Sequence, residues 1–304
     1  MNNVYYSLND YLKNKYNEKV YKIAIDAGFS CPNRDGTKGS GGCIYCNNEA
    51  FVHVSGNSIE EQVYNGIKRL EKRGIKKYIV YFQAYSNTYG SLDEIKKKIE
   101  ASLIDKNIVG IYIGTRPDVV DKEKLMYFSN LNKQYDIFIE YGLQSKHDKT
   151  LNYINRGHRL IDFENAFLLT KSVGLKVCAH IIFGLPCETK DMMLETVNCL
   201  AKLGIDAIKF HHLQIVKNTK IAEIYKENSF SLLTEDEYIK VLTEALSLLP
   251  SNVIISRLVG NTKKDLLVAP KGWPSSTADF VNKLSTYMIN NNMYQGKFFS
   301  ATIF

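Results

Sequence analysis

The sequence predicts an α/β protein in which a partial (β/α)6 barrel is followed by a C-terminal α/β extension. Apolar, strand-like runs alternate with amphipathic helical patterns over the first 216 residues. The runs are almost continuously apolar, which is typical of parallel strands covered by helices. Polar, glycine-containing clusters follow these runs, and in such folds the chemistry gathers at the C-terminal ends of the strands.

The alternation runs from residue 21 to residue 216. In the segment 58–74, apolar residues recur at helical spacing before a glycine stop. The expected order is strand 21–28, helix 58–74, strand 77–85, helix 91–105, strand 108–118, helix 121–130, strand 136–145, helix 147–155, helix 160–174, strand 175–186, helix 189–204 and strand 207–216.

The remaining segment predicts helices at 219–226 and 235–248, a short strand at 252–260, a loop at 269–276 and a last helix at 276–291. The chain shows no linker composition, internal repeat or low-complexity tract. We therefore expect residues 1–216 to form the barrel, with a cysteine loop at 31–46. Residues 217–304 are expected to pack on the barrel within one continuous domain.

The composition favours a cytoplasmic protein with no membrane segment. The first 20 residues are polar and charged, and no apolar run is long enough to cross a bilayer. In a reducing compartment, the six cysteines are expected to be thiols or metal ligands and not disulfides. The net charge of +7 permits a polyanionic partner but does not require one.

Cys31, Cys43 and Cys46 are clustered in one glycine-rich loop at the spacing C-x11-C-x2-C. A structural zinc site needs four ligands, and His53, in an apolar context, is the nearest candidate for the fourth. Three thiolates on a four-iron cluster would leave one iron open, which is what a catalytic metal needs. The loop therefore favours a catalytic cluster, with a zinc site completed by His53 as the alternative.

The loop and later motifs resemble the radical S-adenosylmethionine (SAM) enzymes, in which a Cys-x-aromatic-Cys element ends the cluster loop. The similarity extends over about residues 20–216 and is greatest to the branch that contains the catalytic subunit of Elongator. Within that branch, the chain resembles the YtqA-like subfamily. The motifs that carry the resemblance are "CIYC" (43–46), "GTRPD" (114–118), "IEYGLQS" (139–145), "NRGH" (155–158), "HIIFGLPCET" (180–189), the opening 25–47, "QAYSNTY" (83–89) and "APKGW" (269–273).

The resemblance implies a partial barrel of radical SAM type and two cofactors. Cys31, Cys43 and Cys46 would hold three irons of a [4Fe-4S] cluster, and SAM would chelate the fourth. An electron from an external donor of flavodoxin or ferredoxin type would then release a 5′-deoxyadenosyl radical. The residues implied in cofactor binding are Tyr45, Gln83, Arg116, Glu140, Gln144, Arg156, His180 and Gly184.

Several of these assignments have alternatives. Gln83 stands where the family usually has a Gly-Gly-Glu motif for the methionyl amine, and the neighbouring Tyr85, Ser86 and Asn87 are equally candidates. Arg156 resembles the residue that contacts the SAM carboxylate. Arg116 is either a second anion anchor or the partner of a structural ion pair with Asp118, two residues away.

Other polar residues on the strands are ambiguous. Glu140 interrupts an apolar strand, so it must be paired, point outward or bridge neighbouring strands. His211 and His212 are adjacent on one strand, so at most one is expected to face the site. The remaining cysteines are expected to be small packed residues; they are Cys178, Cys187 and Cys199. A catalytic thiol at Cys187 is the less favoured alternative.

The resemblance implies that the substrate is the wobble uridine of tRNA. The chain has no room for the acetyltransferase domain of the Elongator subunit, so we expect a different radical step. In the YtqA-like subfamily this step trims a carboxymethylaminomethyl group to aminomethyl, before a downstream tRNA methyltransferase acts. The alternatives are a radical SAM enzyme for a small metabolite and a nucleic-acid-binding protein with a structural zinc.

Overall fold

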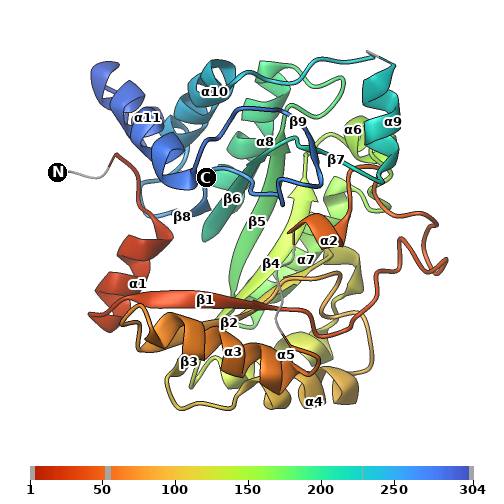
Figure 1. Cartoon of the computed structure of the whole chain (residues 1–304), viewed down its shortest axis with the longest axis vertical. Coiled ribbons are helices and arrows are strands. Elements are labelled where there is room, and N and C mark those ends of the chain that lie inside the picture. Colours follow the sequence, from red (N-terminus) through yellow and green to blue (C-terminus); the bar gives the residue numbers. More distant parts are fainter. Residues whose placement is uncertain (1–3, 52–55, 228, 301–304) are drawn as a thin grey trace.

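The computed structural model describes residues 4–51, 56–227 and 229–300. Its centre is a sheet of seven parallel strands curled into a half-barrel, with the order β1-β2-β3-β4-β5-β6-β8 (Figure 1). The strands are β1 (Val20–Ile25), β2 (Lys77–Phe82), β3 (Ile108–Thr115), β4 (Asp136–Gln144), β5 (Lys176–Phe183), β6 (Ala207–His212) and β8 (Ile254–Arg257).

The α/β fold class and the six barrel strands are therefore confirmed. The seventh strand, β8, comes from the C-terminal segment and pairs with β6, where Ala207 lies opposite Ile254 and Lys209 opposite Arg257. The C-terminal part thus extends the half-barrel sheet itself.

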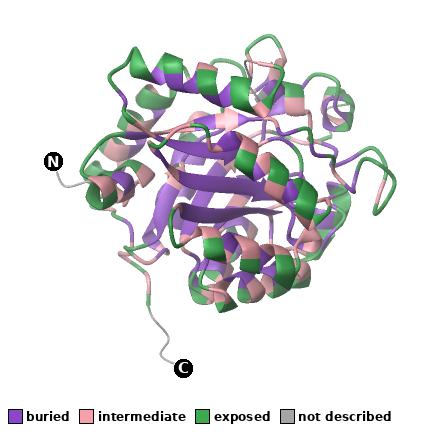
Figure 2. Cartoon of the chain, turned by 90° about the horizontal axis from the view of Figure 1, so that it is seen from below, coloured by how far each residue is buried: buried purple, intermediate pink, exposed green. Residues whose placement is uncertain are grey.

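Helices cover the outer face of the sheet, and Figure 2 shows the buried strands enclosed between them. Most of these helices begin at a Ser, Thr or Asp whose side chain accepts a hydrogen bond from a backbone N–H of the first turn. These residue types are preferred at the N-cap because they satisfy such free N–H groups. The helices of this layer are α3 (Ile59–Glu71), α4 (Leu92–Ser102), α5 (Lys122–Leu131), α7 (Leu160–Ser172), α8 (Lys190–Leu203), α10 (Glu235–Ser247) and α11 (Thr277–Asn290). The short helices α6 (Asp148–Tyr153) and α9 (Lys220–Lys226) pack in a separate apolar cluster that includes Ile44 of the cysteine loop.

Several smaller elements were not predicted. They are the helices α1 (Leu8–Tyr16) and α2 (Asn48–Phe51), the 3₁₀ turn η1 (Pro117–Val119) and the strand β9 (Leu267–Ala269). The expected strand 207–216 divides into β6 and a separate β7 (Ile215–Val216), which pairs with β9 in a two-stranded antiparallel sheet. Helix α1 contacts both edge strands, β1 and β8. The Ile255 backbone N–H also donates to the Tyr6 carbonyl at 2.8 Å, so the segment before α1 is tied to β8.

The lower part of the barrel interior is apolar and aromatic. Leu12 of α1 packs there against strand residues that include Tyr112 and Phe138, whose ring centroids lie 4.7 Å apart. Beside them, buried Asp136 forms ion pairs with Lys15 at 2.5 Å and Lys176 at 3.0 Å. Since this end of the barrel is filled, the open space lies toward the C-terminal ends of the strands.

Among the described residues, no helix is both long enough and apolar enough to span a membrane.

Candidate functional site

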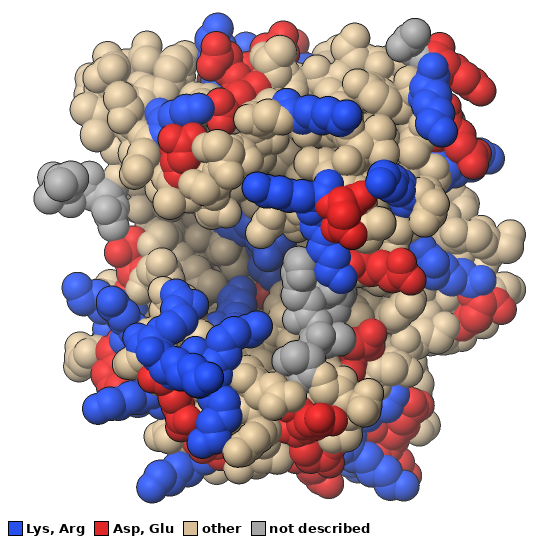
Figure 3. Space-filling view, in the orientation of Figure 1, with Lys and Arg blue, Asp and Glu red and all other residues tan. Residues whose placement is uncertain are grey.

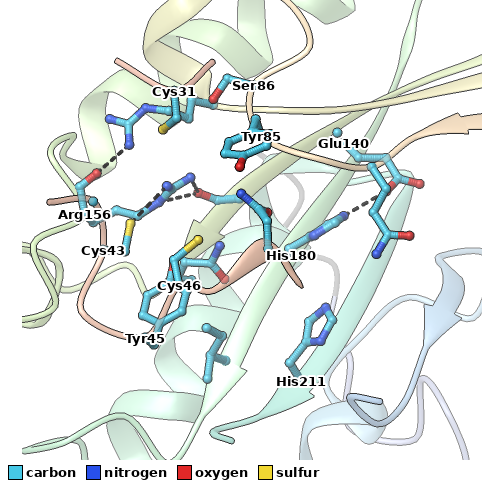
Figure 4. Close-up of a pocket in the computed structure, with 18 of the residues that line it drawn as sticks. Cys31, Cys43, Tyr45, Cys46, Tyr85, Ser86, Glu140, Arg156, His180 and His211 are labelled. Carbon is cyan, nitrogen blue, oxygen red and sulfur yellow. Dashed lines mark hydrogen bonds and ion pairs between the residues drawn. The ribbon is translucent and has the colours of Figure 1, made fainter. Parts of the chain in front are cut away.

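A pocket of about 230 Å³ lies at the C-terminal ends of the strands (Figure 4). All three loop cysteines line it, together with most of the predicted cofactor-binding residues. Those residues are Tyr45, Gln83, Arg116, Glu140, Gln144, Arg156 and His180. The fold therefore brings together side chains that are up to 149 positions apart, between Cys31 and His180.

The cysteine loop is held by its own turns and by a cation. The Arg34 backbone N–H donates to the Cys31 carbonyl at 2.8 Å, and the Cys46 N–H donates to the Cys43 carbonyl at 3.0 Å. Nη1 of Arg156 lies 3.5 Å from Sγ of the buried Cys43. Burial alone would raise the pKa of Cys43, but Arg156 and Arg116 outweigh it and lower that pKa. A thiolate, which is the ligand form, is thus favoured at Cys43.

The three loop thiols do not form the close group of donors that a single metal ion needs. Across the described part of the chain, the only potential metal-ligand group whose donor atoms all lie within 4.8 Å is Glu140, Cys178 and His180, so the loop sulfurs are more widely separated. Ligand sulfurs on one tetrahedral zinc would be about 3.8 Å apart, given a Zn–S bond of about 2.3 Å. His53, the fourth ligand of the zinc alternative, lies outside the described residues.

The group of Glu140, Cys178 and His180 is an ion-pair network and not a metal site. The ammonium groups of Lys209 and Lys22 already face the Glu140 carboxylate, and Lys22 Nζ lies 3.6 Å from Oε1. Burial raises the pKa of the Cys178 thiol above its usual range, which keeps it protonated. A divalent cation would have to displace two lysines and a proton.

Arg156 follows α6 and reaches back over β4. Its Nε and Nη2 donate to the Gly142 carbonyl at 3.1 and 2.7 Å. A side chain at position 142 would put its Cβ 2.7 Å from Nη2, so only glycine leaves room for this approach. The "IEYGLQS" and "NRGH" motifs are therefore linked by direct contact.

For Arg116, the structure shows the ion-pair alternative. Its Nε and Nη2 donate to the two carboxylate oxygens of Asp118 at 2.9 and 3.0 Å, and Nη1 donates to the Arg156 carbonyl at 2.8 Å. Although burial opposes it, the hydrogen bonds and charge of Arg116 lower the pKa of Asp118 to about 2. Arg116 lines the pocket, but its guanidinium donates its hydrogen bonds to Asp118 and to the Arg156 backbone and so positions the segment that carries Arg156.

Glu140 is buried and paired inside the barrel, so it does not point outward. It bridges four strands: its carboxylate accepts from Lys209 of β6 and contacts Lys22 of β1, and Nε2 of His180 on β5 lies 2.8 Å from Oε2. These groups hold the pKa of Glu140 well below its usual range despite the opposing effect of burial. Oε1 makes no hydrogen bond among the described residues.

Both histidines of β6 line the pocket, but they face different neighbours. The His211 ring lies 5.7 Å from that of His180, across from Cys43 in Figure 4. The His212 ring packs on Trp273 at 4.4 Å and on Tyr238 at 5.5 Å. His211 is therefore the one directed toward the site, and Trp273 of the "APKGW" loop supports its neighbour.

The methionyl-amine candidates divide into two kinds. Gln83, Tyr85 and Ser86 line the pocket, and the buried Ser86 hydroxyl makes no hydrogen bond among the described residues. Asn87 instead donates from its amide to the carbonyls of Phe82, Ala84 and Gly114 at 2.7 to 3.1 Å. Asn87 therefore holds the turn after β2 against β3.

Gly184 and Cys187 lie outside the pocket lining. Gly184, just after β5, has φ +81°. This left-handed backbone conformation explains why a glycine stands at this position. Cys187 is exposed and also left-handed, with φ +69°. Neither position contacts the pocket, so a catalytic thiol at Cys187 has no support in this geometry.

Sequence reasoning missed three cations inside the barrel: Lys22, Lys209 and Arg257. Lys209 is buried, and its Nζ lies 4.0 Å from the centre of the Tyr81 ring. Arg257 lines the pocket from β8. The sequence pattern that could have identified these three residues is the one noted for Glu140, because each is a lone charged residue within an apolar strand. Only the strand order shows that these charges share one interior.

Comparisons with known proteins agree with this geometry. Residues 34–200 match the Radical SAM superfamily, and residues 205–290 match the Radical SAM C-terminal domain. The chain is 34% identical over 299 residues to the uncharacterized protein YtqA of Bacillus subtilis, covering 97% of this chain and 92% of YtqA.

Two further similarities are more distant. The tRNA uridine(34) acetyltransferase of Methanocaldococcus infernus is 29% identical over 171 residues, which is 55% of this chain and 31% of that enzyme. The solved structure of the archaeal Methanocaldococcus infernus Elp3 with an N-terminal deletion superposes with a TM-score of 0.69 at 19% identity, covering 91% of this chain and 64% of that one. The second similarity supports the fold alone.

The superfamily match extends over more than half of the chain, and the YtqA match extends over nearly all of both proteins. The three loop cysteines lie in one pocket with Arg156, at the end of the barrel where the strands terminate. This protein therefore belongs to the radical SAM superfamily.

Proposed function

We propose that this radical SAM enzyme acts on the wobble uridine of tRNA and trims a carboxymethylaminomethyl group to aminomethyl. In the balanced reaction, water and SAM would be consumed, the two carbons would leave as glyoxylate, and SAM would be reduced to 5′-deoxyadenosine and methionine. The observation that carries the proposal is the single pocket that joins the cysteine loop to a layer of interior cations. Members of the superfamily bind a [4Fe-4S] cluster and SAM. When bound, these cofactors supply a 5′-deoxyadenosyl radical that takes a hydrogen atom from an unactivated carbon.

The residues of the pocket fit these cofactors. Cys31, Cys43 and Cys46 would hold the cluster, and Arg156 would place its charge beside Cys43 and the SAM carboxylate. Tyr45, half-buried between two of the cysteines in the sequence, offers an aromatic face for adenine. The further residues proposed to contact SAM are Gln83, Gln144, His180 and Glu140, whereas Arg116 would act through Arg156.

The tRNA part of the proposal is supported by the similarity to the tRNA uridine(34) acetyltransferase and by surface charge. Figure 3 shows Lys and Arg side chains gathered on the face that carries α1 and α3, beside a central hollow. The basic patch on α3 and the turn after it consists of exposed Lys68, Arg69, Lys72, Arg73 and Lys76. Such a surface attracts a phosphate backbone.

The reaction also needs partners. An external one-electron donor of flavodoxin or ferredoxin type would supply the electron that starts each turnover, and a tRNA methyltransferase would use the aminomethyl product. A splayed wobble base is the part of a tRNA that a pocket at a barrel mouth can admit.

The test is anaerobic reconstitution with iron and sulfide, followed by SAM, a reductant and tRNA that carries either an unmodified or a carboxymethylaminomethyl wobble uridine. Mass spectrometry would quantify 5′-deoxyadenosine and the digested nucleosides. We expect both 5′-deoxyadenosine and loss of the carboxymethylaminomethyl nucleoside. Cys43→Ala should abolish both, and Cys199→Ala, which removes a thiol on the outer helix α8, should not.

Other outcomes would redirect the proposal. If 5′-deoxyadenosine forms and every tRNA stays unchanged, the tRNA substrate is rejected and a small metabolite is favoured. If the purified protein contains zinc and no iron or sulfide, the structural-zinc alternative replaces the enzyme.

A further inference from the structure

The interior of the half-barrel contains a layer of charged side chains directly above its apolar floor. Lys22 of β1, Glu140 of β4, Lys209 of β6 and Arg257 of β8 supply this layer, and Lys209 and Arg257 are register partners on adjacent strands. The aromatic residues below exclude water from that side, so the buried members of the layer, Glu140 and Lys209, need partners.

The charges of this layer do not balance. Glu140 is the one carboxylate among the described residues that pairs with Lys22 and Lys209. The neighbouring His180 and His211 are neutral, because burial and nearby cations lower the pKa of His180 to about 4 and that of His211 well below its usual range. Lys22, Lys209 and Arg257 therefore face one carboxylate, although burial lowers the pKa of Lys209 to about 7 and that of Lys22 below its usual range.

Arg257 is the cation left over. In the described part of the chain, no ion pair or hydrogen bond engages its guanidinium, although the side chain is half-buried and lines the pocket. A guanidinium that points into a cavity without a partner presents a planar fork of donors that matches a carboxylate.

We propose that Arg257, assisted by the charge of Lys209, binds the carboxylate of the substrate's carboxymethylamino group; this inference rests on the proposed function. The carboxylate is favoured over a backbone phosphate because the layer lies deep in the barrel, whereas the basic patch lies on the surface. Glu140 and His211 lie across the pocket from Cys43 in Figure 4. A carboxylate held on their side presents the carbon beside it to the cofactor side.

The experiment compares binding without turnover. Reconstituted holoenzyme with SAM and no reductant would be titrated with tRNA that carries a carboxymethylaminomethyl wobble uridine, its methyl ester, or an aminomethyl wobble uridine. We expect the wild-type protein to bind the free acid at least tenfold more tightly than the ester or the amine. The ester removes the anion from the ligand, so this arm does not depend on the folding of a variant.

Arg257→Gln should bind all three tRNAs with the Kd that the wild-type protein has for the ester, while keeping its cluster absorbance and melting temperature. Arg257→Lys should retain part of the preference because it keeps the charge. Lys202→Gln, which removes an exposed charge from the end of α8, should keep the full preference.

The failures are distinguishable. If the wild-type enzyme consumes the modified nucleoside but binds the acid and the ester equally, or if Arg257→Gln keeps the preference, the carboxylate site is overturned and the proposed function stands. If the wild-type enzyme forms 5′-deoxyadenosine and consumes no tRNA, the proposed function fails and this inference fails with it.

Discussion

Arg116 and Asp118 are two residues apart, and their ion pair fixes the turn after β3 at the pocket wall. The pair is nearly inaccessible, with side-chain exposures of 2% and 7%. Arg116 also donates to the Arg156 carbonyl, so the pair holds the segment whose guanidinium contacts Cys43. A residue that looks like a substrate anchor in the sequence thus serves to position another one.

Asp118→Asn should destabilise the protein by about 2 to 3 kcal/mol at pH 7, because it removes the negative partner of a buried guanidinium. The folded pKa of Asp118, about 2, lies below the usual 3.8. The stabilisation is therefore complete above about pH 4 and is lost as the pH falls through about 2. Urea unfolding followed by circular dichroism, at several pH values, would measure the difference.

The control for this prediction is Asp265→Asn, since Asp265 is exposed and forms no ion pair among the described residues. It should change the stability by less than about 0.5 kcal/mol at any pH. A constant difference between Asp118→Asn and the wild-type protein from pH 7 to pH 2 would show that folding does not lower the pKa of Asp118.

Helix α1 is the element that closes the lower end of the half-barrel. It contacts the edge strands β1 and β8, which do not pair with each other, and its Leu12 is 2% exposed within the apolar floor. Tyr11 donates from its hydroxyl to Asp136 at 2.9 Å, which adds a polar tie to β4. The helix therefore joins the open edges of the sheet.

Leu12→Ala should lower the free energy of unfolding by about 2 to 5 kcal/mol, because it leaves a cavity under the charged layer. Lys13→Ala, on the exposed side of the same helix, should cost less than about 0.5 kcal/mol. Chemical denaturation of both variants would test this. Equal stability of the two would show that α1 does not close the barrel floor.

On the scale of the whole molecule, the pocket and the basic patch lie on the face shown in Figure 3. The patch belongs to α3, which packs against the edge strand β1. A large polyanion on this surface and a single modified base in the pocket would use separate groups of cations. Affinity for RNA and recognition of the modification are thus separable.

The triple variant Arg69→Gln, Lys72→Gln, Arg73→Gln should weaken binding of every tRNA similarly and reduce the salt slope of log K by about 2 to 3, because up to three phosphate contacts are lost. The three residues are exposed and form no ion pair among the described residues. Filter binding over a range of salt concentrations would measure the slope. The matched control is the triple variant Lys133→Gln, Lys202→Gln, Lys240→Gln. These exposed lysines lie just after α5, on α8 and on α10, respectively.

An unchanged slope for the α3 variant, or an equal reduction in the control, would show that the basic patch does not contact the RNA. Neither variant removes a residue of the pocket. The preference for the free acid over the ester should therefore persist in both.

The sequence by itself determined the fold class, the six barrel strands with their helices, and the cysteine loop, because apolar periodicity and ligand spacing are local properties of the chain. It also pointed to Glu140 as a charge that needs a partner. The sequence did not predict helix α1, since a short polar helix that buries chiefly Leu12 has no strong apolar pattern.

Only the tertiary structure decided which charges meet. Lys22, Glu140, Lys209 and Arg257 are spread over 236 positions, and the strand order places them in one layer. It also showed that Arg116 is occupied by Asp118. The physical reason is that ion pairing and burial depend on distances across the sheet, which the spacing of residues along the chain does not contain.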